Sequence, residues 1–184
     1  KGGFNRLTSV EIGFGGVWVL ADTQLQFIAD ANADDVPDGN AMALLDGWST
    51  KAHHNTVNGL MWGPDGWLYG RHGLKGPSSV GKPGTVDDER IELDCSIWRF
   101  HPIDHRFQVV ARGMVNPWGL DYDDYGQMFI TNNVNGHLWH LVHGALYKRT
   151  AGKGYAPYAY ERMPSCSDHL HFAGKNWQEG WGKS

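Results

Sequence analysis

Apolar and polar residues alternate over short stretches of this chain, and turn residues interrupt them every few positions. The clearest case is GLMWGPDGWLYG at 59–70, where two apolar runs flank Gly-Pro-Asp-Gly. Alternation with a period of two predicts strands, and Gly-Pro-Asp-Gly predicts the turn of a hairpin. No stretch of convincing length follows the helical period. The pattern therefore predicts an all-β chain.

The same strand and turn signals recur along the sequence. Two further strands are expected at GGVWVLAD (15–22) and LQFIAD (25–30), separated by Thr23 and Gln24. Two further hairpins are expected at SIWRFHPIDHRFQVVARG (96–113) and WGLDYDDYGQMFITNN (118–133), and another strand at HLWHLVHG (137–144). The Gly- and Pro-rich stretch at 74–90 is read as an inserted loop on one rim, a common place for functional residues.

These units resemble one another at fixed offsets. Gly59-Leu60 matches Gly119-Leu120 at an offset of 60, and IWRF (97–100) matches LWHL (138–141) at an offset of 41. Recurring four-stranded units of about 40–50 residues predict a β-propeller. A β-sandwich would explain the short strands but not the repeated phrase. At this unit size, the 184 residues make about four blades. We therefore expect 1–184 to be one partial domain of a six- or seven-bladed ring, and a piece of a longer protein.

Composition narrows the function. The chain has 25 glycines, nine tryptophans, seven tyrosines and seven phenylalanines, which suits strands joined by tight turns. The net charge is −4 and no basic patch stands out, so nucleic acid is excluded as an expected partner. No apolar run approaches the roughly 20 residues of a membrane helix. Cys95 and Cys166 lie outside any CxxC or CxxCH motif, so zinc and covalent haem are not expected; a disulfide and two separate thiols both stay open.

Polar residues precede the strands that would lie innermost in a propeller. His54 and Asn55 stand before the strand near Gly59, and Asn116 stands before the strand near Gly119. Asp168 and His169 are placed before a third such strand. Loops of this kind gather around the propeller axis, and a histidine beside a carboxylate can act as a general base near neutral pH. In the alternative, the histidine only bonds turn backbone.

Neighbouring residues of an extended segment point to opposite sides, so we expect His54, rather than His53, to face the propeller mouth. Trp118 follows Asn116-Pro117 at a strand entrance. It is expected to wall a sugar pocket or, like the other strand tryptophans, to pack between blades.

The acidic stretch DANADDVPDG at 30–39 has the spacing of calcium loops. Asp35 replaces the usual glycine, and Ala41 stands where an acidic ligand is usual. We expect a structural calcium ion here, and the alternative is a solvated acidic turn. The predicted ligands are Asp30, Asn32, Asp34, the carbonyl of Val36, and Asp38.

Two of these stretches resemble a known family. HHNTVNGLMWGPDGWLYG is similar to the His-Asn-Gly-Gly…Gly-Pro-Asp-Gly…Leu-Tyr phrase of quinoprotein glucose/sorbosone dehydrogenases. ARGMVNPWGLDYDDYGQMFITNN resembles the Arg-Asn-Pro-x-Gly-Leu…Thr-Asp-Asn phrase of the same family. The phrases also resemble the propeller of bacterial membrane-bound dehydrogenases, which commonly carry a cytochrome c domain. The likeness extends from Gly15 to about His171.

The resemblance implies a periplasmic or extracellular enzyme that oxidises a sugar or alcohol with pyrroloquinoline quinone and calcium. It implies that His54 takes the substrate's hydroxyl proton and that electrons pass to a cytochrome c. Asp168 and His169 are the expected orienting pair of His54 by their equivalent blade position. The expected cofactor-binding residues are Asn55, Asn116 and Trp118, from their positions at the strand entrances, and Arg71 as a substitute cation.

The chain departs from the family pattern at two points. An extra residue separates His54 from Gly59-Leu60, and Val115 replaces the arginine before Asn-Pro. Arg71 and Arg112 are the candidates to supply the missing cation. The alternative function is therefore a non-catalytic propeller, a binding or assembly module with a structural calcium site.

Overall fold

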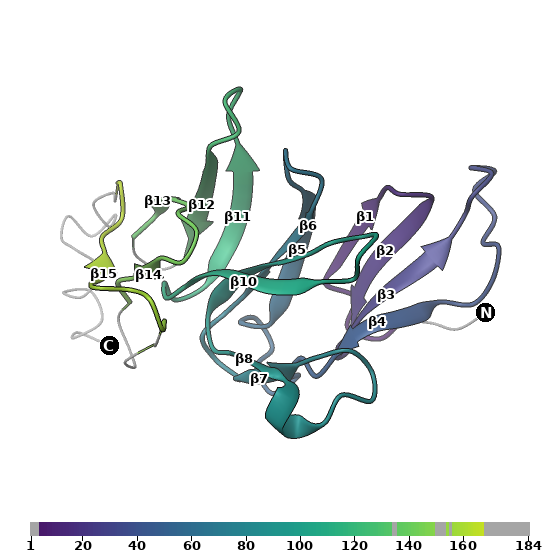
Figure 1. Ribbon diagram of the computed structural model, residues 1–184, viewed down its shortest axis with the longest axis horizontal. Coiled ribbons are helices and arrows are strands. Elements are labelled where there is room, and N and C mark those ends of the chain that lie inside the picture. Colours follow the sequence, from purple (N-terminus) through teal and green to yellow (C-terminus); the bar gives the residue numbers. More distant parts are fainter. Residues whose placement is uncertain (1–3, 134–135, 150–153, 155, 168–184) are drawn as a thin grey trace.

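The computed structural model describes residues 4–133, 136–149, 154 and 156–167, and within them the chain is built from strands (Figure 1). This confirms the all-β prediction. The described residues contain no α-helix, and one 3-10 turn, η1 (Asp87–Glu89), stands outside the sheets. No helix among these residues has the length and apolarity to cross a membrane.

The first sheet contains β1 (Ser9–Ile12), β2 (Gly16–Ala21), β3 (Gln24–Ala29) and β4 (Met42–Asp46), paired antiparallel in chain order. Ala21 pairs with Gln24, so Asp22 and Thr23 form the turn between β2 and β3, one residue earlier than the sequence pattern suggested. Asp22 has a φ of 53°, a left-handed conformation that aspartate tolerates in tight turns.

The second sheet is built around four antiparallel strands: β5 (Val57–Trp62), β6 (Leu68–His72), β9 (Ser96–Phe100) and β10 (Phe107–Arg112). Two short strands, β14 (Leu146–Tyr147) and β15 (Arg162–Met163), extend it beyond β10 in parallel pairing. The third sheet contains β11 (Pro117–Tyr122), β12 (Met128–Asn132) and β13 (Leu138–His140). Beside β13, Ser167 forms an isolated bridge with Leu138.

The inserted stretch between β6 and β9 has more structure than the predicted loop. Its strands β7 (Ser78–Val80) and β8 (Ile91–Leu93) form a separate two-stranded sheet. Arg90 fixes this insertion to the end of β4 through an ion pair with Asp46, at 2.6 Å. The insertion lies at the edge of the molecule opposite the tip of the β11–β12 hairpin (Figure 1).

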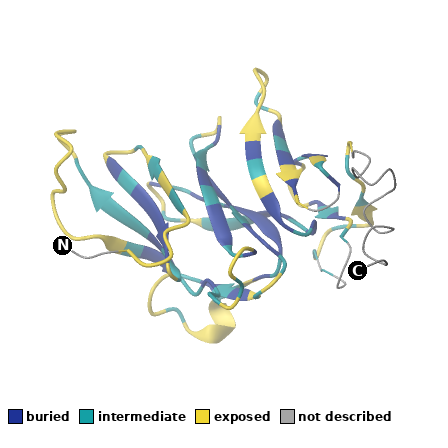
Figure 2. Ribbon diagram, turned by 180° about the vertical axis from the view of Figure 1, so that it is seen from behind, coloured by how far each residue is buried: buried dark blue, intermediate teal, exposed yellow. Residues whose placement is uncertain are grey.

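The three larger sheets follow one another along the long axis of the molecule, and a separate apolar cluster lies on each face of the second sheet (Figures 1 and 2). One cluster joins Trp18 and Trp48 of the first-sheet region to Trp98. The other joins Tyr69 of the second sheet to Trp139 of the third. Three sheets of three or more strands are thus described where about four blades were expected, because β14 and β15 join the second sheet.

The offset of 60 predicted from the sequence is confirmed in the strands themselves. β5 and β11 differ by 60 at both bounds, and so do β6 and β12. Gly66 and Gly126, which occupy the two hairpin turns, have the same left-handed φ of 77°. The repeated phrase therefore encodes the same strand–turn–strand backbone twice.

Candidate functional site

His54, Asn55 and Asn116, singled out from the sequence, lie on loops that meet at one edge of the sheets. We call this the loop edge: residues 4–8, 47–56 and 113–116, which enter β1, β5 and β11, and residues 73–77, which leave β6. Three hydrogen bonds join neighbouring loops: Arg6 Nη1 to the Thr50 carbonyl at 2.7 Å, Lys75 N to Asn55 Oδ1 at 3.0 Å, and Leu74 N to the Val115 carbonyl at 2.9 Å. Segments far apart in the chain are thereby held together here.

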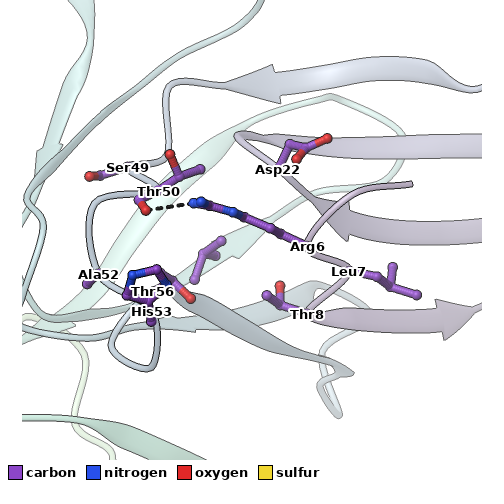
Figure 3. A pocket seen from close by; sticks show the side chains of 10 residues that line it. Arg6, Leu7, Thr8, Asp22, Ser49, Thr50, Ala52, His53 and Thr56 are labelled. Carbon is purple, nitrogen blue, oxygen red and sulfur yellow. Dashed lines mark hydrogen bonds between the residues drawn. The ribbon is translucent and has the colours of Figure 1, made fainter. Parts of the chain in front are cut away.

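A pocket of about 250 Å³ opens at the loop edge, between the first sheet and the loop that enters β5. Figure 3 shows the Arg6 side chain crossing to Thr50, with Asp22 on one side and His53 and Thr56 on the other. Hydroxyl, guanidinium, carboxylate and imidazole groups line the pocket, beside a small aliphatic part. Sequence reasoning missed Arg6 and Asp22. Their only signal was position: they lie at the loop ends of the first sheet, as His53 does before β5.

The two adjacent histidines have different surroundings. Both are exposed, but His53 lines the pocket and His54 is not among the lining residues. Asn55 is buried, and its Oδ1 accepts a hydrogen bond from Lys75 N, so this amide ties two loops together. That His54 faces a propeller mouth stays a prediction, since the pocket at this edge is lined by its neighbour.

Arg71 crosses the strand beside it. Its Nε donates to Asn58 Oδ1 at 3.1 Å, and its guanidinium covers Gly59, where an added Cβ would lie 1.3 Å from Nη2. Among the described residues, no carboxylate forms an ion pair with Arg71. Burial lowers its pKa to about 10, which leaves it charged at neutral pH. Arg71 is therefore a half-buried cation with one neutral partner.

Asn116 and Trp118 lie at the entrance of β11. The backbone N–H of Asn116 donates to Asn132 Oδ1 at 2.7 Å, whereas its own buried Oδ1 has no hydrogen-bond partner in the described part of the chain. Trp118 is 49% exposed, unlike the strand tryptophans of the two apolar clusters. Asp168 and His169, the predicted orienting pair, lie outside the described residues.

The acidic stretch at 30–39 forms a compact exposed turn closed by its own carboxylates. Asp30 accepts hydrogen bonds from the backbone of Asp34 (3.1 Å) and Asp35 (3.2 Å), and Asp38 accepts one from Ala31 N (2.7 Å). Asp34 accepts from Val36 N at 2.9 Å and from Asn32 Nδ2 at 3.0 Å. No group of three or more His, Cys, Asp or Glu side chains placed to hold a metal ion is found among the described residues. Calcium binding stays a prediction.

Arg112, the other candidate cation, donates from Nη1 to the Glu92 carbonyl at 2.7 Å, and burial lowers its pKa. The two cysteines lie apart: Cys95 is buried and Cys166 is exposed, and both are free thiols. Burial raises the pKa of the Cys95 thiol, so it stays protonated and unreactive.

A buried histidine that the sequence did not single out is linked to the loop edge by hydrogen bonds through Ser78. His72 is fully buried at the end of β6, and its Nε2 lies 2.7 Å from Ser78 Oγ. Ser78 Oγ also accepts a hydrogen bond from Ser49 N at 2.8 Å. Burial lowers the pKa of His72 to about 4, so it is neutral at physiological pH. These hydrogen bonds connect His72 of β6 to Ser78 of the insertion and to the pocket residue Ser49.

The comparisons with known proteins identify a family without a described function. No curated protein and no solved structure matches this chain. A family model described as "Domain of unknown function (DUF7133)" matches residues 2–173, nearly the whole sequence. The chain therefore belongs to the DUF7133 family.

Proposed function

We propose that this chain forms part of a β-propeller, and that the protein oxidises a sugar or alcohol with a quinone cofactor at the loop edge. The observation that carries the proposal is the equivalence of the β5–β6 and β11–β12 hairpins. The two dehydrogenase-like phrases fall on these hairpins, whose strand bounds keep an offset of 60. A shared phrase on a shared backbone supports descent from one repeating unit.

The packing of the sheets supports the propeller. β5, the first strand of the second sheet, lies against both β1 and β11, the first strands of the neighbouring sheets. Successive antiparallel sheets packed through their faces, with their first strands adjacent, are typical of propeller blades. A β-sandwich encloses one core between two sheets, whereas the second sheet here has a separate apolar cluster on each face.

In this proposal His54 takes the proton of the substrate hydroxyl. A general base must be reachable by its substrate, and the exposure of His54 meets that condition. The proposed orienting pair, Asp168 and His169, directly follows Ser167, which bridges to Leu138 at the edge of the third sheet. Electrons would then leave to a cytochrome c, in a periplasmic or extracellular setting.

The described residues fit an anionic cofactor. Pyrroloquinoline quinone carries carboxylates, and a half-buried guanidinium without a counter-ion, Arg71, is suited to bind one. Asn116 and the exposed Trp118 at the entrance of β11 complete the proposed binding set, in which Trp118 offers a flat apolar wall. When bound, the quinone would accept the hydride from the substrate carbon.

A second candidate function is a non-catalytic propeller with a structural calcium ion at Asp30–Asp38. Two observations favour it: Asn55 is committed to holding loops together, and Val115 stands where the dehydrogenases have a cation. A calcium titration by calorimetry tests the ion itself. Heat of binding that disappears in Asp30→Asn and persists in Asp124→Asn, an exposed acid of another turn, would support it.

Reconstitution separates the two functions. The full-length protein, incubated with pyrroloquinoline quinone and calcium, should reduce an artificial electron acceptor with at least one sugar or alcohol of a panel. His54→Gln should abolish turnover with quinone binding retained, while the matched variant His53→Gln retains turnover. Absence of both quinone binding and dye reduction in the folded protein would reject the dehydrogenase and leave the binding module.

A further inference from the structure

We propose that the pocket at the loop edge binds a small, uncharged, polyhydroxylated molecule no larger than a monosaccharide. The pocket lies between the segment before β1, the β2–β3 turn and the loop before β5. The inference concerns binding alone, and it goes beyond the proposed oxidation because it needs neither a quinone nor His54.

The size of the pocket limits the ligand. Its volume of about 250 Å³ lies below the roughly 300–1,000 Å³ of pockets for drug-sized ligands. A nucleotide or an oligosaccharide would not be enclosed, whereas a single sugar ring or a short polyol would be. The lining contains no aromatic ring other than the imidazole of His53, so a flat apolar ligand would find little to stack on.

The charges of the lining favour a neutral ligand. Arg6 brings one positive charge and Asp22 one negative charge, and these two groups form no ion pair with each other among the described residues. Arg6 Nη1 is held by the Thr50 carbonyl at 2.7 Å. Both charged groups therefore keep hydrogen-bonding capacity, while their charges cancel over the pocket. A ligand with both donors and acceptors, such as a polyol, matches this arrangement.

Several polar groups of the lining are uncommitted. The Asp22 carboxylate, the His53 imidazole and the Thr56 hydroxyl make no hydrogen bond to another described residue. The small apolar side chains Ala52 and Val57 leave a surface for the C–H face of a sugar. Convergent polar groups beside a short apolar wall are what orient a small ligand.

The backbone of the lining is held in place before any ligand binds. Arg6 and Asp22 both have left-handed backbone conformations, with φ values of 45° and 53°. Such a conformation is costly for arginine, and it persists only where the surroundings enforce it. The Asp22 N–H donates to the Asn5 carbonyl at 3.1 Å, and Arg6 reaches the opposite loop at Thr50. The site is therefore pre-organised, which lowers the entropic cost of binding.

The test is an NMR titration of the ¹⁵N-labelled full-length protein with D-glucose, and with sodium acetate as the anionic probe. We expect glucose at millimolar concentration to shift the amides of Thr50, His53 and Thr56, and acetate to leave them unchanged. Asp22→Asn should weaken glucose binding roughly tenfold, since a charged hydrogen-bond acceptor is replaced by a neutral amide. Asparagine also tolerates the left-handed turn, so the fold should be retained.

The matched control is Asp124→Asn, which removes an exposed carboxylate from the β11–β12 turn and should not change glucose binding. Thr56→Val serves as a second lining variant if Asp22→Asn fails to fold, and it should also weaken binding. Saturable shifts with acetate but not glucose would overturn the proposal in favour of an anion site at Arg6. Absence of glucose shifts, or equal affinity in the lining variants, would overturn it outright. Dye reduction is not measured here, so this result is independent of the dehydrogenase assay.

Discussion

The β5–β6 and β11–β12 hairpins share a backbone but differ in the side chains that it carries. In the second sheet, Arg71 extends its guanidinium across Gly59 to Asn58. At the equivalent place in the third sheet, Thr131 stands over Gly119, where an added Cβ would lie 2.0 Å from Oγ1. The glycine of the repeated Gly-Leu phrase thus makes room for a side chain from the neighbouring strand. The repeated phrase gives both hairpins the same backbone. The residue 12 positions after its glycine, Arg71 or Thr131, determines whether a charged or a neutral side chain lies over that glycine.

Other equivalent positions of β6 and β12 also share a backbone and differ in their side chains. Gly70 of β6 pairs with Trp98, whereas its counterpart Ile130 in β12 pairs with Trp139. His72, buried and neutral, corresponds to Asn132, which is also buried. The second sheet packs between two neighbours and carries the buried His72 and the half-buried Arg71, so its residues are more constrained than those of the third.

The largest expected effect comes from giving the second sheet the residue of the third at position 70. A Cβ at Gly70 would lie 2.1 Å from Trp98 Cζ2, and Trp98 is fully buried against Trp48. We expect Gly70→Ile to reduce the free energy of unfolding by about 3 kcal/mol or more, measured by urea denaturation. In the third sheet, Ile130→Ala should cost about 2–5 kcal/mol by leaving a cavity. A Gly70→Ile chain as stable as wild type would show that Trp98 does not cover this glycine.

A comparable effect is expected from acid. The folded pKa of His72, about 4, lies below its ordinary value of 6.5, so the folded state binds fewer protons than the unfolded state between these values. The contribution of His72 to the free energy of unfolding is fully present above pH 6.5. It is lost as the pH drops toward 4, and the loss over the whole window is about 3 kcal/mol.

Between pH 7 and 4, the free energy of unfolding should depend less on pH in His72→Gln than in the wild type, because glutamine does not titrate. Denaturation curves at several pH values measure this. His105→Gln, at a partly exposed turn, is the matched control and should keep the wild-type slope. An unchanged slope in His72→Gln would mean that other groups carry the acid sensitivity.

A smaller difference separates the two glycines of the repeated phrase. Gly59 has a φ of 62° and lies under the half-buried Arg71, so Gly59→Ala should cost about 2 kcal/mol. Gly119→Ala should cost less than about 1 kcal/mol, because the exposed Thr131 can rotate away. Thermal or urea denaturation of both variants measures the difference. Equal losses would argue that the neighbouring side chain, rather than the backbone conformation, sets the requirement for glycine.

The smallest effect is expected from placing the arginine of the second sheet into the third. Thr131 is exposed, so Thr131→Arg should change the stability by no more than about 0.5 kcal/mol. Its guanidinium should have a higher pKa than that of Arg71, because solvent stabilises the charge. Quinone binding, measured on both this variant and Arg71→Gln, shows whether the position or only the charge matters: loss in Arg71→Gln without gain in Thr131→Arg is the expected result.

The local pattern of the sequence was sufficient for the strands of the main hairpins and for their repetition. Alternating apolar residues around Gly-Pro-Asp-Gly and Asp-Asp-Tyr-Gly predicted the β5–β6 and β11–β12 hairpins, because strand and turn preferences act within a few residues. The offset of 60 came from the same short-range pattern. β1 was missed, since its four residues carry too little pattern, and β14 and β15 were missed for the same reason.

The candidate site depended on contacts that short-range patterns do not contain. The sequence pointed to the histidine pair before β5, but it favoured His54, whereas the pocket is lined by His53 with Arg6 and Asp22 from the first sheet. His53 lies 31 positions after Asp22 and 47 positions after Arg6 in the chain. Their meeting depends on how the sheets pack and on the Arg6–Thr50 hydrogen bond, and neither leaves a periodic signal in the sequence.

Burial separated residues that look alike in the sequence. Asn55, Asn58 and Asn116 are all polar residues near strand entrances, yet the first ties loops together, the second binds Arg71, and the third keeps an orphaned oxygen. The sequence determined the strands of the main hairpins and the turns with their glycines, because these follow from each residue's backbone preference and from the period of its neighbours. Only the tertiary structure decided which polar groups form hydrogen bonds within the protein and which stay available to a ligand. Desolvation and hydrogen-bond partners depend on atoms that packing brings together.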